Sequence, residues 1–125
     1  MKKNILIVDD EKNVTDYLTR ELNDCLPELN VITKNSGYEA LKVLLQGNVD
    51  LLLTDIAMPD MDGYELYSRA KETKEDLPII MMTGFGYDPN HAVVKSRKAG
   101  LKNVIFKPFD INKLISIMKK NLGEV

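Results

Sequence analysis

The sequence is poor in cysteine, and its N-terminus does not resemble a signal peptide. Its 125 residues include one cysteine, Cys25, which cannot form a disulfide within the chain. No charged segment followed by a long apolar run opens the sequence. These features favour a reducing compartment, and we expect a cytoplasmic protein. Cys25 itself is expected to be a small, partly buried residue near the end of a helix.

Long apolar runs and a strong excess of one charge are also missing. Apolar runs such as Leu51–Leu53 and Ile79–Met82 are far shorter than the ~20 residues that a membrane-spanning helix needs. The 17 basic and 19 acidic side chains give a formal net charge of −2. No overall field therefore favours nucleic acid or an anionic membrane. We expect neither to be bound directly, and any partner to be recognised by a local surface.

Short apolar runs alternate with longer amphipathic stretches along the whole chain, without repeats or a Pro/Gly/Ser-rich linker. The apolar runs predict five strands covered on both faces: Asn4–Val8, Asn30–Thr33, Asp50–Thr54, Pro78–Met82 and Asn103–Phe106. The amphipathic stretches predict five helices, at about residues 11–25, 37–47, 63–74, 89–99 and 111–122. This pattern predicts one α/β domain over residues 1–125, with a parallel sheet and helices on both faces.

Residue types at the helix ends support these boundaries. Ser36 with Glu39, and Asp62 with Glu65, have the spacing of a capping box. Asp110 stands where an N-cap is expected. Glycines, which tolerate the positive φ common just after a helix, follow three of the predicted helices: Gly47, Gly100 and Gly123.

Polar side chains follow four of the predicted strands. Asp9 and Asp10 follow the first strand, Asp55 the third, Thr83 the fourth and Lys107 the fifth. Parallel strands bring their C-termini to one edge of the sheet, where ligands bind in such folds. Carboxylates brought together repel unless a cation neutralises them or one is protonated. A few hard oxygen ligands favour Mg²⁺, so we predict a site with Asp10 and Asp55 as direct ligands and Asp9 contributing through water.

The same residues suit phosphoryl transfer. A carboxylate such as that of Asp55 is a nucleophile toward phosphorus, and the phosphoryl oxygens need cationic and hydrogen-bonding partners. Mg²⁺ would serve one oxygen, the Lys107 ammonium a second and the Thr83 hydroxyl a third. Gly84 leaves room for the group, and Pro108 fixes the turn after Lys107. The residues therefore predict phosphorylation of Asp55, with Thr83 and Lys107 as catalytic partners.

Four segments together resemble the signature segments of response-regulator receivers: Ile5-Leu6-Ile7-Val8-Asp9-Asp10-Glu11, Leu53-Thr54-Asp55-Ile56-Ala57-Met58-Pro59-Asp60-Met61-Asp62-Gly63, Met82-Thr83-Gly84 and Phe106-Lys107-Pro108-Phe109. The resemblance covers essentially the whole chain. It implies a flavodoxin-like doubly wound sheet of strand order 2-1-3-4-5. It also implies that the Ala57 backbone carbonyl is a further Mg²⁺ ligand.

The resemblance further implies partners. Asp55 would receive its phosphoryl group from the phosphohistidine of a sensor histidine kinase or a histidine phosphotransfer protein. We expect the helix from Asn13 to Leu22 and the loop after the fifth predicted strand to contact that donor. The output would be a downstream protein target or a fused effector domain.

The switching residues depart from the scheme of many receivers. In those, an aromatic residue three positions before the strand-five lysine turns inward when the threonine moves toward phosphate. Here that position is Val104, whose single stiff χ1 prevents such an exchange. We therefore expect Thr83 to signal through the loop 84–87, which contains Phe85 and two glycines. Ala57 and Phe85, which in this family flank the path of the hydrolytic water, are expected to set the phosphoryl lifetime.

The alternatives fit less well. Acids near helix starts are commonly caps or solvated loop residues, but here Thr83 and Lys107 converge on the same edge. A Mg²⁺-dependent phosphohydrolase of the haloacid-dehalogenase type also forms an aspartyl phosphate, yet its D-x-D-x-[TV] pattern is absent after the first strand. A flavodoxin-like cofactor binder would need a glycine- or hydroxyl-rich phosphate loop there. A pseudo-receiver would have lost its acidic set. We therefore predict a signalling switch that catalyses only its own phosphorylation and dephosphorylation.

Overall fold

Helices and strands alternate along the chain in the computed structural model, which describes residues 2–83, 104–106 and 110–123. In chain order they are β1 (Lys3–Val8), α1 (Lys12–Cys25), β2 (Leu29–Lys34), α2 (Gly37–Leu45), β3 (Leu51–Asp55), α3 (Gly63–Thr73), β4 (Ile79–Thr83), β5 (Val104–Phe106) and α5 (Ile111–Leu122). Within these ranges the predicted elements are confirmed to within one or two residues. The helix predicted at 89–99 lies outside the described residues.

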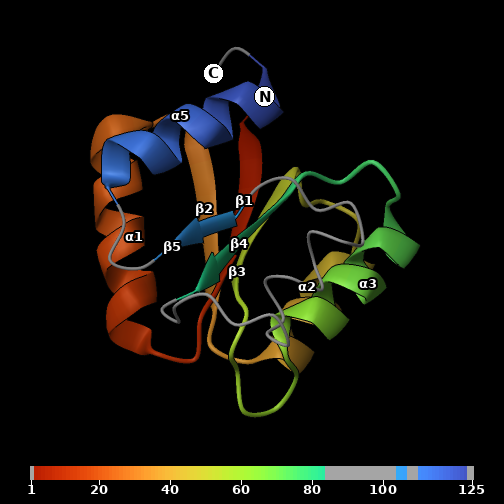
Figure 1. Ribbon diagram of the computed structural model, residues 1–125. Helices are drawn as coiled ribbons and strands as arrows, with labels where there is room; N and C mark the ends of the chain where they lie inside the picture. The colour runs from red at the N-terminus through yellow and green to blue at the C-terminus, as the bar shows by residue number, and fades with distance from the viewer. Residues whose placement is uncertain (1, 84–103, 107–109, 124–125) are drawn as a thin grey trace.

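The strands form one parallel sheet with the order β2-β1-β3-β4-β5. The ribbon shows α1 and α5 on one face of this sheet and α2 and α3 on the other (Figure 1). This arrangement confirms the predicted flavodoxin-like, doubly wound class. Because all strands run in the same direction, their C-terminal ends lie along a single edge.

The sheet divides the core into two clusters. Along β1, alternate side chains point to opposite faces, so Ile5 and Ile7 pack with α1 and α5, whereas Leu6 and Val8 pack with α2 and α3. The helices supply apolar side chains at intervals of four residues: Leu18, Leu22, Leu114 and Met118 on the first face, and Ala40, Leu44, Leu66 and Ala70 on the second. With both faces covered, β1 is buried from Ile5 to Val8.

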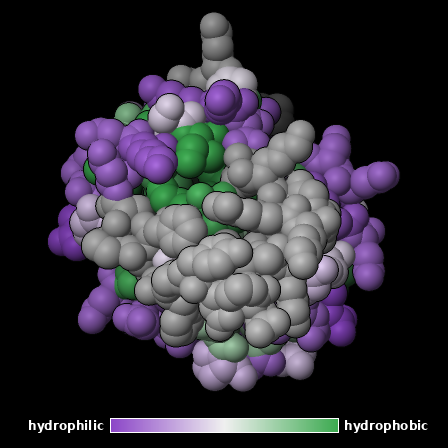
Figure 2. Space-filling model, viewed as in Figure 1, coloured by the Kyte–Doolittle hydropathy of each residue, from purple (hydrophilic) through white to green (hydrophobic). Residues whose placement is uncertain are grey.

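On the face seen in Figure 2, hydrophilic side chains surround the rim of the molecule, and a small apolar patch is visible below α5. Within the described residues, no helix has both the length and the apolar character that a bilayer span requires.

The predicted helix ends are confirmed where they are described. The N-caps accept hydrogen bonds from backbone N–H groups: Ser36 Oγ from Glu39 at 3.4 Å and Asp62 Oδ1 from Glu65 at 2.7 Å. Asp110 likewise caps α5 through the Asn112 N–H at 2.9 Å. Two of the predicted glycines have positive φ, with Gly47 at 82° and Gly123 at 76°.

The prediction for Cys25 is wrong, because its side chain is exposed. The buried side of α1 passes through Leu18 and Leu22 and continues to Leu26 just beyond the helix. This four-residue interval leaves Cys25, one position before Leu26, on the solvent side.

Candidate functional site

The three carboxylates predicted to meet at the C-terminal edge of the sheet do so, and Thr83 ends the neighbouring strand. Asp9 and Asp10 follow β1, and Asp55 is the last residue of the adjacent strand β3. Carboxylate oxygens of these three residues lie within 4.8 Å of one another. Thr83 ends β4, the next strand, whose Met82 pairs with Asp55. We call Asp9, Asp10 and Asp55 the acidic site.

Burial strengthens the repulsion between the carboxylates of the acidic site. Asp9 is fully buried and Asp55 is 6% exposed, while Asp10 is open to solvent. Carboxylates held this close and largely away from water repel strongly unless a cation lies among them. Their hard oxygens, with one acid on the solvent side, suit a divalent ion that keeps part of its water shell. The donor set therefore fits a divalent metal such as Mg²⁺.

Asp9 is held by backbone and side-chain hydrogen bonds. Its N–H donates to the Lys34 carbonyl at 3.2 Å, which extends the pairing of β1 with β2. Its Oδ1 accepts from the Glu11 N–H at 2.9 Å, and its carbonyl accepts from Asn35 Nδ2 at 2.8 Å. The carboxylate is thus fixed just where β1 turns into α1.

The backbone after Asp55 is fixed by the start of α3. The Ile56 N–H donates to the Met82 carbonyl at 3.0 Å, and the Gly63 N–H donates to the Ile56 carbonyl at 2.7 Å. A Cβ on Gly63 would lie 2.4 Å from the Asp55 carbonyl oxygen. Glycine is therefore needed here because the two backbones approach closely. This role was not predicted from the sequence, where its only signal is a glycine at the first helical position.

Asp60, in the loop between β3 and α3, is a second residue whose role was not predicted from the sequence. Its carboxylate accepts hydrogen bonds from Ser36, Tyr38 and Gly37 at the start of α2. The Ser36 hydroxyl lowers the pKa of Asp60 below its ordinary value of 3.8; burial opposes this, and the N–H groups of Tyr38 and Gly37 add to it. Asp60 therefore remains a carboxylate at neutral pH.

The other predicted site residues are Thr83, Ala57 and Val104, which the structure describes, and Lys107 and Phe85, which it does not. Thr83 is buried. Ala57, in the loop after β3, is exposed. Val104 begins β5 and packs, partly buried, against the cluster formed with α2 and α3. Lys107 and Phe85 lie outside the described residues.

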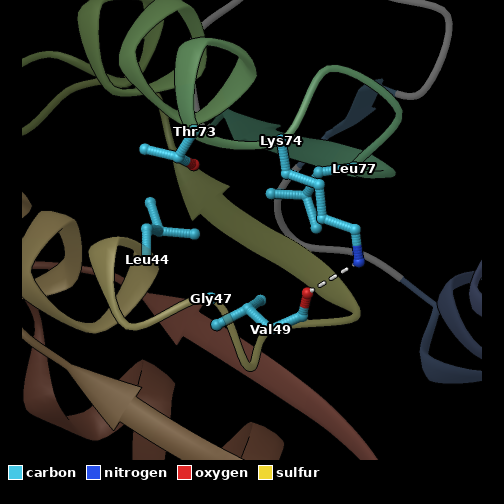
Figure 3. A pocket seen from close by; sticks show the side chains of 6 residues that line it. All are labelled: Leu44, Gly47, Val49, Thr73, Lys74 and Leu77. Carbon is cyan, nitrogen blue, oxygen red and sulfur yellow. Dashed lines mark hydrogen bonds between the residues drawn. The ribbon is translucent and has the colours of Figure 1, made fainter.

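A small cavity of about 90 Å³ lies at the opposite edge of the sheet (Figure 3). Its lining includes Val49 and Leu77, which precede β3 and β4, and Lys74 Nζ donates to the Val49 carbonyl across it at 3.5 Å. None of the described residues that line it carries a carboxylate. The acidic site and this cavity therefore lie at opposite ends of the strands.

Fold and site together define a doubly wound α/β domain whose acidic site, at the C-terminal edge of its sheet, is consistent with a divalent metal. Residues 5–119 match the profile of the response regulator receiver domain. The chain is 31% identical over 122 residues to sporulation initiation phosphotransferase F of Bacillus subtilis, covering 98% of this chain and 95% of that protein. A receiver domain protein from Methanospirillum hungatei superimposes with a TM-score of 0.87 at 31% identity, covering 98% and 94% of the two chains.

Other relatives are much longer than this chain. It is 38% identical over 91 residues to the probable transcriptional regulator ycf29 of Pyropia yezoensis, of which the match covers 40%. It is 34% identical over 117 residues to the DNA-binding transcriptional regulator NtrC of Klebsiella pneumoniae, of which the match covers 24%.

The chain belongs to the response regulator receiver domain family. Receivers are typically signalling switches that pair with histidine kinases or phosphotransferases. The acidic site of this chain is typical of receivers that accept a phosphoryl group.

Proposed function

We propose that the whole chain, residues 1–125, is a Mg²⁺-dependent phosphoacceptor that takes a phosphoryl group onto Asp55. The donor is the phosphohistidine of a sensor histidine kinase or a histidine phosphotransfer protein. The observation that carries the proposal is the convergence of three carboxylates within 4.8 Å at the edge where Thr83 ends the next strand. The chain acts as a switch and catalyses only its own phosphorylation and dephosphorylation.

Asp9, Asp10 and Asp55, together with the Ala57 carbonyl, would hold the metal ion. When bound, Mg²⁺ supplies positive charge that offsets the carboxylates and the incoming phosphoryl oxygens. The exposed Asp10 stands on the side from which ion and donor arrive, while the hydrogen bond from the Glu11 N–H keeps Asp9 in place.

Transfer needs one bond made and one broken. A carboxylate oxygen of Asp55 forms a bond to phosphorus as the phosphorus–nitrogen bond of phosphohistidine breaks. The bonding electron pair leaves with the imidazole nitrogen, which takes up a proton. The Thr83 hydroxyl and the Lys107 ammonium stabilise the phosphoryl oxygens. The near-complete burial of Asp55 keeps bulk water from competing for its carboxylate.

Phosphorylation would then change the binding of a downstream protein target or a fused effector domain. Thr83, Phe85 and Val104 are the proposed switch residues, with the signal leaving through Phe85 and its loop. The packing of Val104 against the α2 and α3 side supports this route, because a β-branched side chain in that place has little freedom to change rotamer. Contacts to the phosphoryl group must supply the ~5.5 kcal/mol that a shift from 1:99 to 99:1 requires.

A labelling experiment tests the proposal. A small-molecule phosphodonor with Mg²⁺ should add one phosphoryl group to the wild-type protein, detected by mass spectrometry, and none to Asp55→Asn. Asp50→Asn is the matched control, because Asp50 lies just before the same strand but at its opposite end. It should be labelled like the wild type. An undiminished mass shift in Asp55→Asn would refute the assignment.

A further inference from the structure

The loop between β2 and α2 carries none of the residues of the acidic site, yet it contacts both loops that bring them together. On one side, Asn35 Nδ2 donates to the carbonyl of Asp9 at 2.8 Å and to Thr15 Oγ1 at 3.2 Å. Thr15 is buried in the first turns of α1. Asn35 therefore ties this loop to the Asp9 backbone and to the helix that follows it.

On the other side, the next residue reaches the loop after Asp55. The Ser36 hydroxyl donates to Asp60 Oδ2 at 2.6 Å. Asp60 also accepts from the N–H groups of Gly37 and Tyr38, both at 3.3 Å, while Ser36 Oγ accepts from the Glu39 N–H at 3.4 Å. The first three N–H groups of α2 are thus satisfied, two of them by a carboxylate from another loop.

Packing reinforces this link. A Cβ on Gly37 would lie 2.8 Å from the Cβ of Met61, the residue after Asp60. The loop from Ile56 to Gly63 is therefore held at its beginning by β4, at its end by the Gly63 N–H and in between by α2. Ala57, with its proposed ligand carbonyl, lies between the first and the last of these anchors.

We infer that Asn35, Ser36 and Asp60 form a brace that positions the two loops carrying the proposed metal ligands. These are positioning residues, because they contact the loops and none of them is among the proposed metal ligands. The inference rests on the proposed function. Without the brace, part of the ordering of the Asp9 and Ala57 backbones would have to be achieved when the ion binds, which would weaken binding.

The test measures Mg²⁺ affinity by calorimetric titration of the full chain with the metal alone. Asp60→Ala and Ser36→Ala should each weaken binding by about three- to tenfold, less than the 10–100-fold typical of residues that bond a metal ligand directly. The double variant should bind Mg²⁺ only slightly more weakly than Asp60→Ala, because removing Asp60 already breaks the hydrogen bond that Ser36 donates to it. Asp60→Asn, which keeps the shape and one acceptor, should fall between Asp60→Ala and the wild type.

A second readout separates positioning from general loss of stability. Labelling of Asp55 by a small-molecule phosphodonor should be slow in Asp60→Ala at low Mg²⁺ and should recover at saturating Mg²⁺. The control is Asp50→Ala, which removes a carboxylate that accepts from the Asn4 N–H at 2.7 Å at the opposite edge of the sheet. It should destabilise the fold and leave Mg²⁺ affinity unchanged.

Two outcomes would overturn the inference in distinguishable ways. If the wild type binds Mg²⁺ and is labelled, but the brace variants match Asp50→Ala in both readouts, the brace has no positioning role. If the wild type neither binds Mg²⁺ nor is labelled, the proposed function fails and the brace fails with it. The amides of Gly37 and Tyr38 give an independent check, because their hydrogen exchange should accelerate in Asp60→Ala.

Discussion

Replacing Gly63 by alanine should damage both the fold and the acidic site. The new Cβ would lie 2.4 Å from the Asp55 carbonyl oxygen and 2.7 Å from Ile56 Cα, whereas ordinary contact begins near 3.4 Å. The overlap is thus about 1 Å (3.4 minus 2.4), and both neighbours are backbone atoms that cannot rotate away. We expect the free energy of unfolding to fall by about 3 kcal/mol, which is the upper end of the usual cost of overpacking a core. Chemical denaturation should measure it.

The matched control is Gly47→Ala. Gly47 has a φ of 82° and nothing within 4 Å of the added Cβ, so its cost of about 1–2 kcal/mol is conformational alone. Gly63→Ala should be the less stable variant, and its phosphodonor labelling at Asp55 should be slowed, whereas Gly47→Ala should be labelled normally. If the free energy of unfolding of Gly63→Ala were within about 0.5 kcal/mol of the wild-type value, the close approach of the two backbones at Gly63 would be refuted.

Four further outcomes are expected. Mg²⁺ should bind weakly, because water completes much of its coordination shell, and Asp10→Asn should weaken binding further by removing a charged ligand. A titration that gave the same Mg²⁺ affinity for Asp10→Asn and the wild type would place the metal elsewhere. Ala57→Asn and Phe85→Ala should alter the decay rate of the phosphorylated protein, and unaltered decay in both would remove them from the path of the hydrolytic water. Val104→Ala should change the phosphorylation-dependent affinity for a partner by less than about tenfold relative to the wild type, or ~1.4 kcal/mol. A folded Val104→Ala protein that bound its partner equally with and without phosphorylation would show that the signal passes through β5. Because the pKa of Asp60 is lowered by folding, its stabilisation is present above about pH 4 and lost as pH falls further. In acid titrations, the stability gap between wild type and Asp60→Asn should therefore narrow below that pH, and a constant gap would contradict the linkage.

The sequence was sufficient for the acidic site because a simple rule connects the residues. Asp9, Asp10 and Asp55 each follow an apolar run that reads as a buried strand, and parallel strands end at one edge. No contact between distant side chains had to be known in advance. The rule also placed Thr83 at this edge, while the predictions for Lys107 and Phe85 remain predictions.

The roles of Asp60 and Gly63 could not be predicted from the sequence, because they depend on distances between segments that are brought together only by folding. Asp60 looks like any acid near a helix start, and only the folded chain shows that the helix it caps is α2 and not the following α3. The role of Gly63 likewise depends on how closely α3 approaches β3. The error at Cys25 came from helical phase, because a shift of one position separates it from the buried Leu26.

The division of the core by the sheet has a consequence for how this protein can change. Leu22 and Leu66 belong to separate clusters, one beneath α1 and one beneath α3, with the sheet backbone between them. Among the residues that the structure describes, the two clusters have no apolar member in common, so the effects of substitutions in the two layers on stability should add. The surface of α1 can then diverge and acquire new recognition properties while the α2–α3 layer is inherited intact. Such a fold behaves as two independently adjustable halves joined at the sheet edge that carries the acidic site.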